Sequence, residues 1–191
     1  MPRPNLEVNS NFTQRLTWNA QSKQWKTRDS EGFDVYPEKP CGVMAVDDIR
    51  TAWFAFETGG APDIVWDVNG KKGPKPSDNH RRGFAVYWLL EDYELREFSA
   101  TSDAAIRAIL KLYSEYEKAP EAAQGLLPIV EYAGAIPAKG RYGTSFEPEL
   151  KITGWAYRPD ELPEPDPISP GAAGSTGKRS GSELSGDTPF G

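Results

Sequence analysis

Residues 95–130 read LREFSATSDAAIRAILKLYSEYEKAPEAAQGLLPIV, and their order of elements decides the fold. The middle of the stretch, residues 102–118, predicts an amphipathic helix, with Thr101 or Ser102 as the N-cap and Pro120 just beyond the end. Apolar side chains spaced i, i+3, i+4, i+7 and i+10 are expected on one buried stripe: Ile106, Ile109, Leu110, Tyr113 and Tyr116. Both ends of the stretch predict strands, so the helix connects one strand to another.

Strand-like segments lie on both sides of this helix. Residues 51–57 (TAWFAFE) and 82–90 (RGFAVYWLL) are rich in the aromatic and β-branched residues that favour strands. Residues 93–99 follow the second run as the return arm of a hairpin. An earlier hairpin is expected around the polar turn at 19–23. The other predicted strands are residues 15–18, 24–28, 126–132 and 149–157.

This order of elements predicts a mainly-β fold. Several strands, one helix and two further strands are typical of an OB-fold, a five-stranded barrel whose helix falls between the third and fourth strands. We therefore expect an OB-fold-like barrel with one helix. A small β-sandwich with an inserted helix is the alternative.

A change of composition divides the chain at residue 160. Residues 160–191 hold 5 Pro, 6 Gly and 5 Ser and have too few large apolar side chains to offset the entropy of ordering, which predicts a disordered acidic tail. Six acids and two bases give this tail a formal charge of −4, which leaves −2 of the total −6 for residues 1–159. A nearly neutral folded domain at 1–159 does not disfavour a nucleic-acid partner.

Cysteine and histidine occur once each, at Cys41 and His80. They cannot supply the four ligands of a zinc finger or a disulfide framework, which excludes those classes of protein. No cofactor is expected. A catalytic triad would depend entirely on His80. No apolar run approaches the ~18 residues that span a bilayer, and the first ten residues lack the apolar region of a signal peptide, so we expect a cytoplasmic protein with no membrane partner.

Residues 69–82, NGKKGPKPSDNHRR, form the one strongly basic stretch. Their glycines and prolines predict a loop, and loops on a β scaffold commonly carry binding groups. Clustered cations gain affinity for a phosphodiester backbone by releasing its counterions. A merely solvated loop is the alternative. The candidate binding residues here are Lys71, Lys72, Lys75, His80, Arg81 and Arg82.

Strand alternation assigns faces to the aromatic side chains. Phe84, Val86, Trp88 and Leu90 are expected in the core, as are Phe54 and Phe56, and Leu150, Ile152 and Ala156. Rings that face outward are candidates for stacking on bases, which is worth ~1–3 kcal/mol per base and tolerates any sequence. Packing of some of these rings under loops is the alternative. The candidate stacking rings, with the lysine beside two of them, are Trp53, Tyr87, Trp155, Tyr157 and Lys151. Trp66, just before the basic loop, is a further candidate DNA contact.

Two smaller segments complete the candidate sites. The connection before the last strand reads KGRYG, residues 139–143, and adds Lys139, Arg141 and Tyr142 as candidate DNA contacts, because this loop borders the ligand groove of an OB-fold. The end of the tail places an aromatic anchor beside negative charge, which predicts docking to a basic-rimmed apolar pocket of a partner, although an inert tail is the alternative. This tip comprises Asp187, Thr188, Pro189 and Phe190.

Over residues 12–162 the chain resembles the single-stranded-DNA-binding proteins of bacteriophages. The resemblance is carried by KPSDNHRRGFAVYWLL, by residues 95–130 and by GTSFEPELKITGWAYRPDELP. It implies an OB-fold that binds single-stranded DNA in phage replication, recombination or repair, in the host cytoplasm, with no catalysis and no metal. DTPF is similar to the Asp-Ile-Pro-Phe tip of bacterial relatives, although Gly191 follows it here. It implies recruitment of a DNA polymerase, helicase or recombinase, and a homo-oligomer is compatible with it.

Two other functions are weighed against DNA binding. Pro62-Asp63 and Glu149-Leu150-Lys151 fit the Pro-Asp and Glu-x-Lys elements of a Mg²⁺-dependent nuclease, in which carboxylates hold the metal. Asp63 and Glu149 are 86 positions apart, far more than in the compact hairpin that usually joins these groups, so coincidence is favoured and no enzyme is expected. A protein-interaction module without DNA binding is the third hypothesis.

Overall fold

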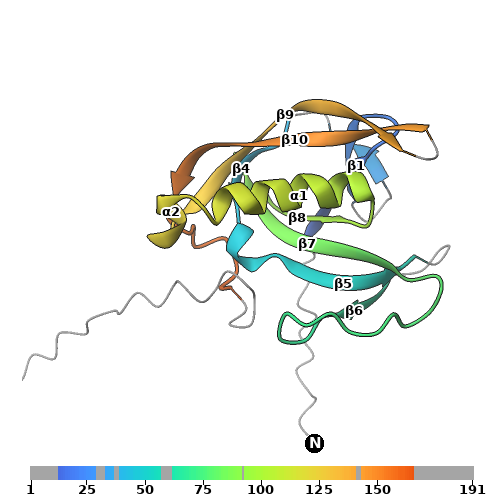
Figure 1. Cartoon of the computed structure of the whole chain (residues 1–191). Helices are drawn as coiled ribbons and strands as arrows, with labels where there is room; N and C mark the ends of the chain where they lie inside the picture. Colours follow the sequence, from blue (N-terminus) through green and yellow to red (C-terminus); the bar gives the residue numbers. More distant parts are fainter. Residues whose placement is uncertain are drawn as a thin grey trace, which may run out of the picture.

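The computed structural model describes residues 13–28, 33–36, 39–56, 62–91, 93–140 and 143–165. Within them, ten strands form one sheet, and α1 lies between the β9–β10 hairpin and the β5–β7 pair (Figure 1). The helices are α1 (Asp103–Tyr116), α2 (Pro120–Ala123) and the 3-10 helix η1 (Val46–Asp48). The strands are β1 (Gln14–Asn19), β2 (Gln24–Arg28), β3 (Phe33–Val35), β4 (Cys41–Met44), β5 (Arg50–Ala55), β6 (Asp63–Trp66), β7 (Arg81–Leu90), β8 (Leu95–Ala100), β9 (Leu127–Gly140) and β10 (Gly143–Ala156).

The sheet is built around β7, the central strand. Its neighbours run in the order β10-β9-β4-β7-β8-β1-β2-β3, and β5 pairs with β7 on one side and β6 on the other. β4 and β5 pair with successive parts of β7, because η1 interrupts what would otherwise be one strand. The β1–β8 pair is parallel and the other pairs are antiparallel.

The mainly-β class is confirmed, and α1 falls between β8 and β9 as the sequence predicts. A five-stranded barrel with a single helix is not confirmed, because the described residues form an open sheet of ten strands and include a second helix, α2. The extra strands have a simple origin: the N-terminal hairpin adds to the edge of β8, and β6 adds to the edge of β5. Two hydrogen bonds still join β10 to the end of β1, from the Trp18 indole to the Phe146 carbonyl (2.7 Å) and from the Phe146 amide to the Ala20 carbonyl (2.9 Å).

The core lies between α1 and the inner face of the sheet. Phe84, Val86, Trp88 and Leu90 are buried, which confirms the alternation predicted for β7. Trp25 is at the centre of an aromatic cluster, with ring centroids 5.0–5.8 Å from those of its neighbours. Those neighbours are Trp18, Trp88, Phe98 and Tyr132.

The buried stripe of α1 differs from the predicted one. The Ser102 side chain accepts a hydrogen bond from the Ala105 amide, so the predicted N-cap is confirmed. Ile109 and Tyr116 are buried as expected, but Leu110 is 60% exposed. Alanines replace the expected large residues on the buried face, because their small side chains allow the helix to lie close to the sheet. The buried residues of α1 are Ala104, Ala105, Ala108, Ile109, Leu112 and Tyr116.

The packed part of the chain continues beyond residue 159, the end of the predicted domain. Leu162 is 4% exposed and packs with Ala45, Leu89 and Leu127. Arg158 fixes this segment, because its guanidinium contacts both carboxylate oxygens of Asp47 (2.7 and 2.8 Å) and the carbonyl of residue 163 (2.7 Å). The predicted tip, residues 187–190, lies outside the described residues. None of the helices in the described ranges is long and apolar enough to cross a membrane.

Candidate nucleic-acid interface

The candidate interface lies on the β5–β6–β7 part of the sheet. Register places Arg50 opposite Ala85, and Ala52 opposite both Gly83 and Trp66, so the side chains of these residues share one face. Tyr87 belongs to the same face, two residues beyond Ala85. We call this the stacking face. The opposite face, called the groove face, carries Thr51, Trp53, Arg82 and Phe84.

An arginine and two aromatic rings form the centre of the stacking face. The Arg50 Cζ atom lies 4.8 Å from the ring centroid of Trp66 and 4.8 Å from that of Tyr87. Arg50 Nη2 is 2.9 Å from Glu97 Oε2, and Glu97 Oε1 is 3.5 Å from Arg15 Nε. Because Glu97 holds Arg50 in place, the cation and both rings are arranged before any ligand arrives.

Small residues separate these side chains along the sheet. Ala52 and Ala85 are fully buried, and Ser99, opposite Ala85 on β8, is 7% exposed. Gly83 is buried as well, and a Cβ atom there would come within 2.8 Å of the Phe54 ring. These small residues leave space for the larger side chains of the stacking face. Position 83 tolerates no side chain, because the Phe54 ring occupies the space that it would need.

Exposed rings extend the stacking face toward the end of β5. Trp66 is 38% and Phe56 is 65% exposed. Phe56 stacks on Phe54 with centroids 6.3 Å apart and an interplanar angle of 11°, and Phe54 meets Trp66 edge-on at 5.9 Å. The predicted inward position of Phe56 is wrong, because the register places Trp53 on the same face as Phe84 and so leaves Phe54 and Phe56 together on the opposite face. Exposed aromatic patches of this kind are typical of binding surfaces.

Trp53, predicted to be a free stacking ring, is buried beneath the basic loop. It is 9% exposed, and its indole N–H donates to the Gly73 carbonyl (3.0 Å). Lys72 Nζ and Arg82 Cζ lie 5.2 and 5.5 Å from the Trp53 ring centroid. Trp53 therefore supports the loop and its cations and does not offer a free face to a base.

Asp67 is the second anchor of the loop. Its carboxylate accepts hydrogen bonds from the Arg82 guanidinium (Nη1–Oδ1 2.8 Å), the Thr51 hydroxyl and the Gly73 amide. The hydrogen bond from Arg82 is the main reason that the pKa of Asp67 lies below its usual value of 3.8. Burial acts in the opposite direction and raises the pKa, and the hydrogen bond from Thr51 lowers it further. A depressed pKa means that the ionised carboxylate stabilises the folded state.

We expect Asp67→Asn to lower the free energy of unfolding at neutral pH, because the Arg82 cation loses its charged partner. The pKa of Asp67 is lower in the folded state, so its contribution is present above about pH 4 and is lost as pH falls through the folded pKa. The difference between wild type and variant should therefore shrink in acid, as measured by urea unfolding at several pH values. Asp78→Asn, an exposed acid of the same loop, is the control and should change little. A difference for Asp67→Asn that is independent of pH would contradict this role.

His80, a predicted DNA contact, is 6% exposed and fastens the end of the loop. Its Nδ1 lies 2.8 Å from the Ser77 hydroxyl, and its Nε2 lies 3.3 Å from an Asp63 oxygen, an ion-pair distance without hydrogen-bond geometry. The imidazole is therefore covered and does not reach the surface with the cations of the loop. The predicted cations that do reach solvent are Lys71, Lys72, Lys75 and Arg81, with Arg82 half-buried.

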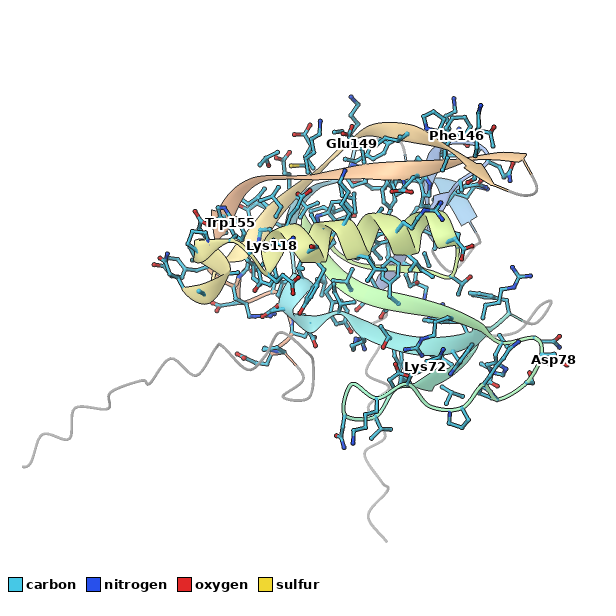
Figure 2. The ribbon with its side chains drawn as sticks, viewed as in Figure 1. Lys72, Asp78, Lys118, Phe146, Glu149 and Trp155 are labelled. Carbon is cyan, nitrogen blue, oxygen red and sulfur yellow. The ribbon has the colours of Figure 1, made fainter. Side chains whose placement is uncertain are left out.

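The predicted residues of β10 lie on the other side of α1 from the loop, as the labels of Lys72, Asp78, Glu149 and Trp155 show (Figure 2). Lys151 pairs with Glu149 at 3.3 Å. Trp155 packs on Tyr116 (6.1 Å between centroids), so its predicted outward position is wrong, and the cause is a register shift between Ile152 and Gly154. Tyr157 is 83% exposed, as predicted, but it follows directly on β10, which pairs with β9, so neither Tyr157 nor Lys151 lies on a strand of the stacking face.

The tip of the β9–β10 hairpin is described only in part. Lys139 is exposed near the end of β9, whereas the predicted contacts Arg141 and Tyr142 lie outside the described residues. The β9–β10 hairpin and the β5–β7 pair lie on opposite sides of α1 (Figure 1). The structure therefore brings Trp66, Tyr87 and the basic loop onto one part of the sheet and leaves Lys139 apart from them.

The two nuclease-like elements are not brought together. Asp63 lies on β6 beside His80, and Glu149 lies on β10 beside Lys151, with α1 between the two strands (Figure 1). Within the residues that the structure describes, no group of three or more His, Cys, Asp or Glu side chains could hold a metal ion.

Arg50, Arg15 and Glu97 were missed by the sequence analysis. They come from three strands, β5, β1 and β8, and meet only through the pairing of those strands. The one local signal is that Arg50 directly precedes the aromatic run of β5.

Comparison of the chain with protein-family models, curated proteins and solved structures found no match. The resemblance to phage single-stranded-DNA-binding proteins therefore stays a prediction from the sequence.

Proposed function

We propose that this protein binds single-stranded DNA, without sequence preference, on the stacking face and the adjoining basic loop. The observation that carries the proposal is the arrangement of Arg50 against Trp66 and Tyr87, both at 4.8 Å from its Cζ atom. Aromatic rings that are partly open to solvent can stack on any base, because every base has a π-face. The proposed role rests on the site and not on any relative.

The basic loop supports the same ligand. Lys71, Lys72, Lys75 and Arg81 are exposed, and Trp53 and Asp67 hold the loop against the sheet. A loop that is already held loses little conformational entropy when phosphates bind to it. Arg81, opposite Phe54, brings a cation of this stretch to the stacking face, so phosphates are expected along Arg81 and the loop and bases on Trp66 and Tyr87.

The strand pairing also supports an OB-like arrangement. Before the helix, β4, β7 and β8 pair in succession, and after it, β9 and β10 pair with each other and β9 returns to β4. An OB-fold places its helix between the third and fourth strands of such a set. On this proposal β1–β3 and β6 are additions to an OB-like sheet. The roles in replication, recombination or repair, and recruitment of a partner by the tail, follow from the resemblance of the sequence alone.

Titration of the full chain with oligo(dT), followed by intrinsic tryptophan fluorescence, tests the proposal. We expect quenching, because bases stack near Trp66, and we expect the affinity to fall as salt rises, because counterions are released on binding. The oligonucleotide should remain intact when Mg²⁺ is added. Absence of binding at low salt would refute the proposal, and cleavage that requires Mg²⁺ would favour the nuclease hypothesis.

A further inference from the structure

A cavity of about 290 Å³ lies between α1 and the groove face of β5 and β7. Its lining is almost entirely apolar, and the side chains on it that carry polar atoms are those of Thr51, Arg82 and Tyr113. Ligand pockets usually enclose ~300–1,000 Å³, so this cavity lies at the lower end of that range, a size suited to one small group. The principal lining residues are Thr51, Arg82, Phe84, Ile106, Leu110 and Tyr113.

The helix side of the cavity is an apolar stripe at the edge of the core, in which Ile106 and Tyr113 are partly buried against the core cluster. Ile106, Leu110 and Tyr113 follow one another at i, i+4 and i+7, and Leu110 is 60% exposed. An exposed leucine by itself needs no explanation, but an apolar stripe that lines a cavity is typical of a binding surface. The alanine-rich buried face of α1 leaves these larger residues beside the sheet.

The sheet side of the cavity connects it to the basic loop. Arg82 lines the cavity and shares the Trp53 ring with Lys72, at 5.5 and 5.2 Å from the ring centroid. Cationic side chains therefore border the apolar lining directly. A ligand that carries negative charge beside a flat apolar ring matches both parts, and a polynucleotide repeats that combination at every unit.

We propose that a nucleobase of the bound single strand enters this cavity while its phosphates lie along Lys72 and Arg82. The inference rests on the proposed function and extends it from the stacking face to the groove face. Arg81 and Arg82 are consecutive residues of β7 and project to opposite faces of the sheet. A DNA strand that passes around the edge of the sheet beside the loop therefore meets a cation on each face. Inside the cavity the base packs on Phe84 and Tyr113, without base-specific hydrogen bonds.

The test compares Leu110→Ser with Ile136→Ser in the full chain, using a fluorescein-labelled oligo(dT) and an abasic phosphodiester of equal length. Ile136 is the matched control, because it is a 41% exposed apolar residue on β9 that does not line the cavity. We expect Leu110→Ser to weaken oligo(dT) binding about fivefold or more and Ile136→Ser to leave it unchanged. Binding of the abasic strand should be equal in all three proteins, since it has no base to place in the cavity. Circular dichroism should show that both variants remain folded.

The outcomes separate this inference from the proposed function. If wild type fails to bind oligo(dT), the proposed function itself is refuted. If wild type binds and Trp66→Ala weakens binding, but Leu110→Ser behaves like Ile136→Ser, the cavity does not hold a base. An acidic peptide with leucine and phenylalanine anchors is the third probe. Binding of this peptide to wild type but not to Leu110→Ser, with oligo(dT) affinity unchanged, would overturn the inference in favour of a protein partner.

Discussion

Replacement of Trp66 by alanine should lower the affinity for oligo(dT) by about 5- to 150-fold. That range corresponds to the ~1–3 kcal/mol that one stacked base contributes, with 1.4 kcal/mol for each factor of ten. Trp66 is 38% exposed and lies against Arg50, so its loss removes a stacking ring and frees the guanidinium that the ring helps to hold. Anisotropy of a labelled oligo(dT) measures the effect without relying on tryptophan fluorescence.

Tyr157→Ala is the matched control for this prediction. Tyr157 is more exposed than Trp66, at 83%, and the sequence predicts it to be a DNA contact, but it follows β10 and lies on no strand of the stacking face. We expect its replacement to leave the affinity unchanged. Urea unfolding of both variants separates a loss of binding from a loss of folding. Equal losses of affinity in the two variants would show that the stacking face is not the interface.

Replacement of Lys71, Lys72 and Lys75 by glutamine is expected to have a comparable or larger effect. Each phosphate contact contributes about 0.7 to the slope of log K against log salt for single strands, so three lost contacts should reduce the slope by about 2. We expect a loss of affinity of about ten- to hundredfold at low salt that narrows as salt rises. Titrations at several salt concentrations measure the slope directly.

A second triple variant, Lys118→Gln with Lys139→Gln and Lys151→Gln, removes the same charge from other surfaces. All three lysines are exposed. Lys118 follows the C-terminal end of α1, and Lys139 and Lys151 lie on the β9–β10 hairpin. The account predicts that the salt slope of this control stays close to that of wild type. A slope that falls equally in both variants would mean that net charge, and not the basic loop, determines binding.

The sequence predicts the central strand well and the strand ends poorly. Phe84, Val86, Trp88 and Leu90 alternate along β7 and all belong to the same core cluster, so their burial follows from their spacing. In β5 the spacing is regular as well, but the register places Trp53 and not Phe56 on the core face, and in β10 Trp155 follows a register shift. Alternation assigns a side chain to a face only where pairing continues, and the points where pairing stops depend on partner strands far away in the sequence.

Helix α1 shows a different limit. Its N-cap could be predicted because the capping hydrogen bond is local, from Ala105 to Ser102. Its buried face could not, since the larger side chains favour a stripe through Leu110, whereas close packing on the sheet selects the alanines. Because the alanines face the sheet, the larger side chains of α1 remain on the stripe that lines the cavity.

The sequence indicates which types of residue form the candidate site, but not how they are arranged in space. The cations of the basic loop are evident from the sequence, but the burial of Trp53 depends on a hydrogen bond to Gly73, 20 residues away. Arg50 meets Glu97 only because β5 and β8 both pair with β7, a pairing that no local pattern indicates.

The central claim, that a single strand binds on the β5–β6–β7 face, is tested most directly by mapping where DNA touches the protein. Photocross-linking of oligo(dT) containing 5-iododeoxyuridine, followed by mass spectrometry of the cross-linked peptides, gives that map. We expect cross-links to the peptides that contain Trp66 and Tyr87. Cross-links confined to the β9–β10 hairpin, with none to these two peptides, would contradict it.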